Sequence, residues 1–281
     1  MSILLDAFKL KPMAALKFLR AKGMATSFHW YDMWQEAHDK AFTVAKAMDA
    51  DVLQDIRSMV DKAVAEGITF QQFKRELTPR LQARGWWGKK EMVDPSTGKT
   101  IEVQLGSPAR LKTIFQTNMN TSYAAGHWRR QAAHAKRRPY LQFQAVLDSR
   151  TRPEHRALDG KVFPIEDTFW KTHYPPLGYN CRCSVVSLSK YDIDESNTPV
   201  EKSGANLVER TVVVGRGDDI RDAHVTGYKT TNAEGQPVTV WTDPGFDYNP
   251  GRKDWEPDLT KYDSDIAKAY RQMQRKQSIK R

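Results

Sequence analysis

The stretch DSRTRPEHRALDGKVFPIEDTFWKTHYPPLGYNCRC, residues 148–183, is dense in local structural signals. Apolar and polar residues alternate just before it, at positions 141–147, which predicts a strand that ends where the stretch begins. Thr151 followed by Glu154 is a capping-box pattern, which indicates the start of a helix. The first half of the stretch therefore predicts a strand end and a short capped helix that carries His155.

The second half of the stretch predicts a stiff loop followed by a strand. Pro175 and Pro176 restrict the backbone, and residues 183–188 have the composition of a strand. Cys181 and Cys183 are the only cysteines of the chain, which excludes a disulfide framework. A pair two residues apart is poorly placed to form a bridge, but along an extended segment both thiols lie on the same face.

Two thiols on one face and the imidazole of His155 form a candidate metal site. Thiolate and imidazole are the ligands that zinc prefers, and His173 or an aspartate could complete a tetrahedron around a structural zinc ion. The spacing differs from that of the common zinc fingers. The alternative is that Cys181 and Cys183 are small buried apolar groups and that His155 is a hydrogen-bonding residue of the core.

The same residues also allow a catalytic interpretation. A cysteine beside a histidine can act as a nucleophilic pair, and Arg182 could lower the pKa of a neighbouring thiol. His155 with Asp148 could instead form a metal-dependent nuclease site. However, no third group that would orient the histidine is evident, and two adjacent thiols suit metal binding better than attack. We therefore expect no catalytic residues and no enzyme.

The chain before residue 139 predicts helices with apolar faces. Four of them are expected upstream of a break near Gly85, and the pattern of the fourth contains Pro79, where a bend or break is predicted. Their limits are Pro12 to Gly23, Trp30 to Met48, Leu53 to Gly67, and from Thr69 onward with Gln72 as partner in a capping box.

A hairpin and a long helix follow the break. Residues 91–93 and 100–105 flank a turn sequence, which predicts an inserted hairpin within about 86–105. Trp86 and Trp87 at its base could be an exposed docking feature or buried there. Ser107-Pro108 is typical of a helix start, and the following pattern extends to about Lys136.

These elements predict an α+β fold: a helical N-terminal region, then a small mixed domain of short strands, then a C-terminal helix and basic tail. Residues 211–214 and 237–241 are expected to be strands of the later part. The expected division is 1–138 for the helical region, 139–190 for the segment built around residues 148–183, 191–257 for a small β-rich extension, and 258–281 for the terminal helix and tail.

The chain is basic, with 44 lysines and arginines against 34 acidic residues and a formal charge of +10. Such a balance favours a polyanionic partner such as DNA, or an acidic protein surface. No apolar run reaches the length of a membrane span, so no membrane partner is expected. Two groups of cations are candidates for contact, although the first also suits a helix C-terminus: Arg129, Arg130, Lys136, Arg137 and Arg138, and the tail residues Lys268, Arg271, Arg275, Lys276, Lys280 and Arg281.

The stretch 148–183 resembles the core signature of the phage Mu F-like family, which includes minor head proteins of tailed phages and Mu-like prophages. The segments 117–126, 85–88 and 244–251 also resemble that family, which extends the resemblance over about residues 8–255. The signature positions are Asp148, Arg150, Thr151, His155, Leu158, Gly160, Pro176, Gly178, Asn180, Cys181 and Cys183.

The resemblance implies a role in head morphogenesis. Members of the family are present in few copies per head, associate with the portal and help to assemble the procapsid, and some contact DNA. The implied partners are therefore the portal protein, capsid or scaffold proteins and viral DNA bound without sequence specificity. The implied location is the host cytoplasm during assembly and then the virion head. The alternatives are a metal-dependent enzyme acting on nucleic acid through His155, Cys181 and Cys183, and a simple DNA-binding module.

Overall fold

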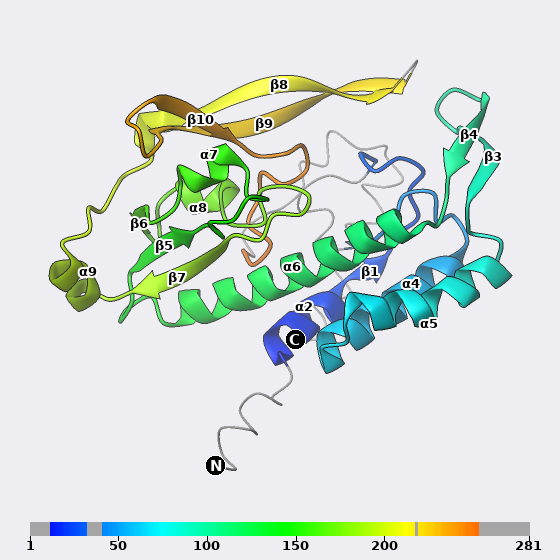
Figure 1. Ribbon diagram of the computed structural model, residues 1–281, viewed down its shortest axis with the longest axis horizontal. Helices are drawn as coiled ribbons and strands as arrows, with labels where there is room; N and C mark the ends of the chain where they lie inside the picture. The colour runs from blue at the N-terminus through cyan, green and yellow to red at the C-terminus, as the bar shows by residue number, and fades with distance from the viewer. Residues whose placement is uncertain (1–11, 33–40, 217–218, 253–281) are drawn as a thin grey trace, which may run out of the picture.

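The long helix α6, Pro108–Ala133, runs through the middle of the molecule (Figure 1). The computed structural model describes residues 12–32, 41–216 and 219–252. The helix begins as the sequence predicts, because the Ser107 side chain accepts a hydrogen bond from the backbone N–H of Arg110 and Pro108 occupies the first turn. It is the element on which the rest of the described fold is arranged.

Three helices pack against α6: α2 at Met13–Ala21, which meets α6 near Gly126, α4 at Ala50–Glu66, and α5 at Phe70–Ala83. The side chain of Asp49 caps α4, and Gly67 ends this helix in a left-handed conformation with φ 68°. The predicted capping box is present at the start of α5, where Thr69 accepts from the backbone of Gln72 and the Gln72 side chain accepts from Thr69.

The apolar faces of these helices enclose the first of the two large clusters of buried residues found in the described chain. Phe73, Leu77 and Leu81 of α5 are fully buried in it. Pro79 lies between them on the exposed side of the same helix, which continues to Ala83. The predicted break at Pro79 is therefore wrong, because the packing of the apolar face holds the helix together across the missing backbone donor.

The predicted helix from Trp30 to Met48 is also wrong in its described parts. Residues 28–32 form turns, and β2, Ala41–Phe42, pairs in parallel with β1, Gly23–Met24. The Asp32 carboxylate accepts hydrogen bonds from the backbone N–H groups of Phe28 and His29, at 2.9 and 2.7 Å. A side chain that bonds to nearby backbone in this way competes with helix formation.

The hairpin after α5 forms where the sequence predicts it. β3, Lys89–Val93, pairs antiparallel with β4, Thr100–Gln104. Trp86 is buried at its base, and its indole N–H donates to the carbonyl of Lys46 at 2.8 Å. Of the two alternatives for this tryptophan, burial is the one observed.

The second half of α6 lies against a three-stranded antiparallel sheet in the order β6-β5-β7. Its strands are β5 at Tyr140–Gln144, β6 at Val162–Pro164 and β7 at Ser184–Leu188, and two short helices accompany them, α7 at Pro153–Arg156 and α8 at Phe169–Thr172. β5 ends earlier than the alternation over residues 141–147 predicts. Trp128 of α6 joins the second buried cluster, which also contains Leu158 and Phe163.

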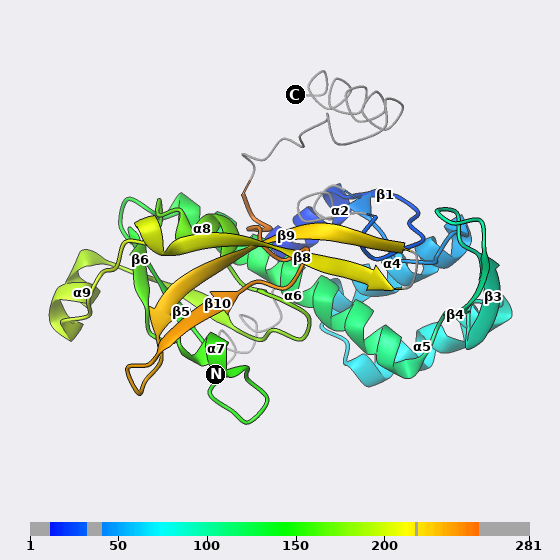
Figure 2. The same cartoon turned by 90° about the horizontal axis from the view of Figure 1, so that it is seen from above.

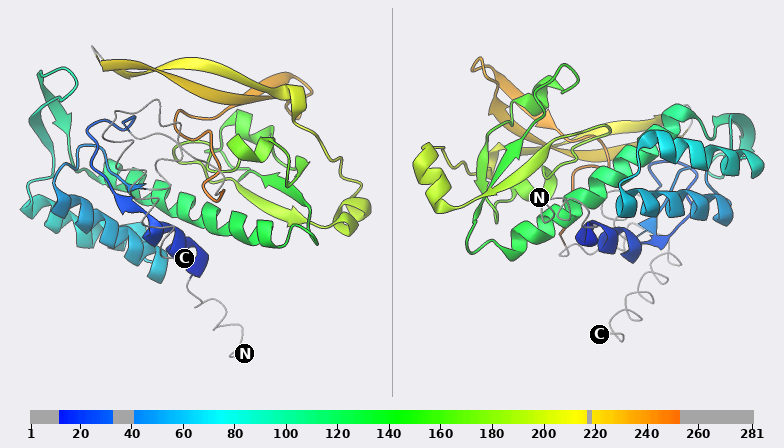
Figure 3. Two further views of the ribbon diagram at one scale, coloured as in Figure 1. Left: turned by 180° about the vertical axis from the view of Figure 1, so that it is seen from behind. Right: turned by 60° about the horizontal axis from the view of Figure 1, so that its bottom comes forward.

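A short helix and a long β arm follow the sheet. The helix α9, Lys190–Ser196, has a capping box between Ser189 and Asp192 that the sequence prediction missed. After the short 3-10 turn η1, Gly204–Asn206, the arm has the order β10-β9-β8, with β8 at Leu207–Arg216, β9 at Asp219–Thr231 and β10 at Pro237–Trp241. It extends above α6, on the side opposite to α4 and α5 (Figures 1–3). The predicted strands at 211–214 and 237–241 belong to it, whereas β9 was not predicted.

The described part of the chain is an α+β fold, as predicted. The expected helix and basic tail from residue 258 onward lie outside the described residues. None of the helices in the described ranges has both the length and the apolar character of a membrane span.

Candidate functional site

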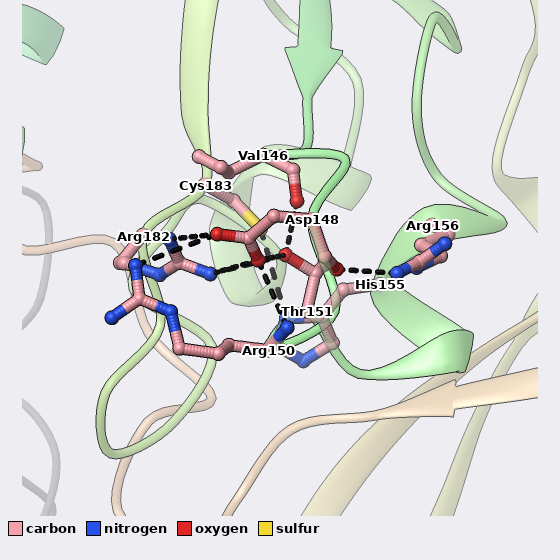
Figure 4. Close-up of polar contacts among 8 residues, drawn as sticks. All are labelled: Val146, Asp148, Arg150, Thr151, His155, Arg156, Arg182 and Cys183. Atoms are coloured by element: carbon pink, nitrogen blue, oxygen red, sulfur yellow. Dashed lines mark hydrogen bonds and ion pairs between the residues drawn. The ribbon is translucent and has the colours of Figure 1, made fainter.

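His155 lies in α7, whose start differs from the sequence prediction. The predicted capping box between Thr151 and Glu154 is wrong, because Arg152 occupies the cap position and no side chain caps the helix. The Thr151 hydroxyl donates instead to the carbonyl of Val146 and to Asp148 (Figure 4). These bonds close the loop between β5 and α7, which fixes the start of the helix by a different route.

Asp148 is paired with Arg182, on the segment just before β7. The two guanidinium nitrogens of Arg182 donate to the two carboxylate oxygens at 2.8 and 2.5 Å, and the backbone N–H of Arg150 donates at 3.0 Å. The pKa of Asp148 lies well below its usual range, chiefly because of the hydrogen bonds from Arg182. This two-pronged pair joins both ends of the signature stretch, and it leaves the carboxylate engaged rather than open to a metal beside His155.

His155, Cys181 and Cys183 meet in a compact cluster, called the Cys–His triplet below. The Cys181 and Cys183 sulfurs lie 3.8 and 3.7 Å from His155 Nδ1, and the three ligand atoms are all within 4.8 Å of one another. His155 and Cys181 are buried, Cys183 is half-buried, and both thiols are free. Thus the structure brings together three of the four residues predicted to bind a metal.

The reason for this convergence is not the one that the sequence suggested. Cys181 and Cys183 precede β7 and lie in irregular backbone rather than in a strand. Asn180, immediately before them, has a left-handed conformation with φ 61° and turns the chain toward α7. The carbonyl of Cys181 also accepts a hydrogen bond from Asn120 of α6, at 2.8 Å, which fixes this segment against the long helix.

The Cys181 and Cys183 thiols influence each other's pKa. The pKa of Cys181 lies well below its usual value, first because Cys183 donates a hydrogen bond to its sulfur and further because the His155 ring faces it, while burial opposes the shift. The pKa of Cys183 is raised by the same bond to Cys181 and by burial. Backbone hydrogen bonds from Leu177 to Cys181 and from Val146 to Cys183 favour the thiolate form of each.

His173, predicted as a fourth ligand, lies elsewhere. It is fully buried, stacks on Phe169, and both of its ring nitrogens are engaged, Nδ1 with Thr172 at 2.9 Å and Nε2 with the carbonyl of Val240 at 3.1 Å. Burial lowers the pKa of His173 to about 4. The expectation that His173 completes the metal site is therefore wrong, since its nitrogens already serve the packing of α8 against β10.

The remaining signature positions have structural surroundings. Leu158 is fully buried in the second cluster, and Gly160 has φ 76°, where glycine avoids strain. A Cβ added to Gly178 would lie 2.1 Å from the carboxylate of Asp243. The bond between Pro175 and Pro176 is cis. By contrast, Arg150 is largely exposed, with a 3.5 Å contact to Asp148.

Two polar contacts of this region were not foreseen. Arg152 and Asp243 form a two-pronged pair at 2.7 and 2.8 Å, which joins the start of α7 to the loop after β10. Gln131 of α6 accepts from the Tyr174 hydroxyl and donates to the carbonyl of Val185, both at 2.8 Å. Sequence spacing carries no signal for such contacts, because the partners are 91, 43 and 54 residues apart.

Of the cations predicted at the end of α6, some make contacts within the fold and others are exposed on the surface. Arg138 donates to the carbonyl of Ser187 and lies 3.5 Å from Asp192, and the guanidinium of Arg129 lies over the ring of Phe18. Arg130 and Arg137 are exposed beside a shallow hollow of about 620 Å³ between the end of α6 and β7. The tail cations fall outside the described residues: Lys268, Arg271, Arg275, Lys276, Lys280 and Arg281.

Comparison with known proteins places this region in context. Residues 54–186 match the family described as Phage Mu protein F like protein. Protein F of Escherichia phage Mu is named as a capsid assembly protein. It is 44% identical to this chain over 245 residues, which are 87% of this chain and 55% of that protein. The F protein of the Mu-like prophage FluMu of Haemophilus influenzae is 38% identical over 232 residues, or 81% of this chain and 53% of that protein. The chain thus spans about half the length of these curated relatives, and no solved structure matches it.

Proposed function

Because the chain belongs, through residues 54–186, to the Phage Mu protein F like family, we propose that it is a minor head protein that takes part in capsid assembly. The observation that carries this proposal is the 44% identity, over most of the chain, to a protein named for capsid assembly. The fold supports it, because β8 is an edge strand of the β arm that lies above α6 (Figure 1), and another head protein could pair with that edge.

The specific partner that we propose is the portal protein, together with coat or scaffold proteins, during assembly in the host cytoplasm. Co-purification from cells in which a related Mu-like prophage is induced tests this contact. A tagged copy of the chain should retain the portal protein, whereas a copy that lacks residues 207–231, the β8–β9 hairpin, should retain less. A second copy, shortened only in the β3–β4 hairpin, should retain as much portal protein as the full-length chain. This control separates loss of the arm from general damage to the fold. Absence of portal and coat proteins from the full-length sample would contradict the proposed contact.

We also propose non-specific contact with viral DNA through the exposed end of α6. Arg130 and Arg137 flank the hollow beside β7, and His127 and His134 also line it. Cations that neutralise phosphates release counterions, so retention on DNA should fall steeply as salt rises. The tail cations beyond residue 267 are a second candidate for the same contact.

A pair of double variants tests the surface at the end of α6. Arg130→Glu with Arg137→Glu should weaken retention on DNA at low salt by at least about tenfold, since two charges are reversed and the net charge facing the phosphates falls by four units. The matched control, Arg75→Glu with Lys112→Glu, makes the same change of charge at exposed positions of α5 and α6 distant from the hollow. Equal weakening by both pairs would show that only the net charge matters.

We propose a structural rather than a catalytic role for the Cys–His triplet. A nucleophile and base pair is commonly completed by a third group that orients the base. His155 Nε2 is buried and has no hydrogen-bond partner among the described residues, so nothing there holds the ring in a catalytic orientation. Asp148, the other candidate partner, is held by Arg182.

A further inference from the structure

The Cys–His triplet is a second connection between two segments that the Asp148–Arg182 pair already joins. His155 comes from α7, between β5 and β6, whereas Cys181 and Cys183 come from the segment that leads into β7. Two free thiols and an imidazole nitrogen lie here within 4.8 Å of one another. We propose that His155 Nδ1 and the sulfurs of Cys181 and Cys183 bind one zinc ion, which clasps α7 to the segment before β7.

The distances fit this ion. In a tetrahedral site with bonds of about 2.3 Å to sulfur and about 2.0 Å to nitrogen, each sulfur lies about 3.5 Å from the nitrogen. The observed separations from His155 Nδ1 are 3.8 Å for Cys181 and 3.7 Å for Cys183. As hydrogen bonds between neutral groups these contacts are long and weak, so a metal explains them better than thiol–imidazole bonding does.

The ligand types select zinc among the common ions. Thiolate and imidazole are soft or borderline ligands, which suit zinc and disfavour magnesium and calcium. Two thiolates neutralise the ion, and the backbone hydrogen bonds from Leu177 and Val146 to the sulfurs are the kind of outer contact that supports metal-bound thiolates. The positive charge of Arg182 does not compete with the zinc ion for the two thiolates, because its guanidinium is paired with Asp148.

The fourth position of the tetrahedron has room for a small ligand. A hollow of about 150 Å³ lies against both cysteines and is also lined by Asn120, His127 and Pro176. A water molecule needs about 30 Å³, so one can enter as the fourth ligand. His127, the other histidine beside the sulfurs, is not part of the cluster of ligand atoms.

Metal analysis of the full chain tests the proposal. Protein expressed without a polyhistidine tag in zinc-supplemented medium and purified without chelator should carry about one zinc ion per chain. Cys183→Ser should reduce this below about a tenth of an ion, because one thiolate is lost. His127→Gln, which changes a histidine beside the same hollow, should leave the zinc content unchanged.

Cobalt(II) provides a second measurement that does not depend on the folding of any variant. Wild-type protein refolded with cobalt should show the visible bands of tetrahedral cobalt and a thiolate-to-metal charge-transfer band, and zinc should displace both. A wild-type zinc content below about a tenth of an ion together with no cobalt bands would overturn the proposal. It would equally be overturned if Cys183→Ser, still folded by circular dichroism, kept the full zinc content.

Discussion

Substitution of Gly251 by alanine should dislodge the loop that follows β10. An added Cβ would lie 2.4 Å from Cβ of Trp128, 2.6 Å from its Cδ1 and 2.7 Å from its Cγ. Carbon atoms that are not bonded approach to about 3.5 Å, so a shift of about 1 Å is required. The Cβ of Trp128 is fixed by the backbone of α6, and its ring packs edge-on against Tyr174. The loop must therefore be the part that moves.

The cost follows from what the loop loses when it moves. Asn249 is buried, its side chain donates to the carbonyl of Trp170 at 2.9 Å, and it accepts from the backbone N–H of Gly251 at 2.9 Å. Overpacking of a buried contact costs about 1–3 kcal/mol, and a buried hydrogen bond left unmade costs about 1–3 kcal/mol. Because a detached loop escapes the clash, we expect about 2–4 kcal/mol rather than the sum of both upper limits.

Thermal and urea unfolding measure this loss. At about 2–4 °C per kcal/mol for a chain of this size, Gly251→Ala should lower the melting temperature by roughly 5–15 °C. Gly98→Ala is the matched control: Gly98 has φ 69° with nothing within 4 Å of an added Cβ, so only backbone strain of about 1 kcal/mol applies. A melting temperature for Gly251→Ala equal to or above that of Gly98→Ala would refute the steric reasoning.

Three further predictions follow from the contacts around the signature. The pKa of Asp148 is held down by Arg182, so the pair stabilises the fold above the unfolded pKa of about 3.9, and this contribution is lost as the pH falls toward the folded value; urea midpoints between pH 5 and 2 should decline less for Asp148→Asn than for the wild type. Gln131→Leu leaves the Tyr174 hydroxyl and the Val185 carbonyl without partners and should cost about 2–4 kcal/mol in urea unfolding, whereas a change within about 0.5 kcal/mol would show that water replaces the amide. A chelator should lower the melting temperature of protein that contains zinc by several degrees, and added zinc should restore it, because the ion binds only the folded chain.

Local signals were sufficient for the end of α4, the start of α5 and the start of α6. The capping box at Thr69 and Gln72, the stop at Gly67 and the start at Ser107 each involve residues within four positions of one another, and all three were predicted. The helix from Trp30 to Met48 failed because only the near-helical spacing of its apolar residues indicated it. There Phe28 and Phe42 are buried in the first cluster from turns and a short strand, with Asp32 closing the turn.

The β arm was predicted only in part, because the sequence of its central strand, β9, lacks a clear alternation of apolar and polar residues. β9 contains Asp219, Arg221, Asp222 and Lys229 among its apolar residues, so its alternation is weak. Its ladder with β8 and β10 depends on pairing across the arm, which composition does not encode.

The candidate site was predicted by residue type more than by geometry. The types and spacing of His155, Cys181 and Cys183 indicated a shared site, and the structure brings them together. His173 could not be excluded from sequence, because its engagement with Val240 joins residues 67 positions apart. The partner of Asp148 is likewise 34 residues away, and the loop that closes the distance is turned by a left-handed asparagine.

Quantitative mass spectrometry of purified, DNA-free procapsids tests the assembly role most directly. Procapsids from a Mu-like prophage that encodes this chain should contain it beside coat and portal proteins, at a few copies per particle. Procapsids made after deletion of its coding sequence should be malformed or scarce, and the wild-type chain supplied in trans should restore them. Well-formed particles that contain coat and portal proteins but none of this chain would contradict the proposed role as a minor head protein.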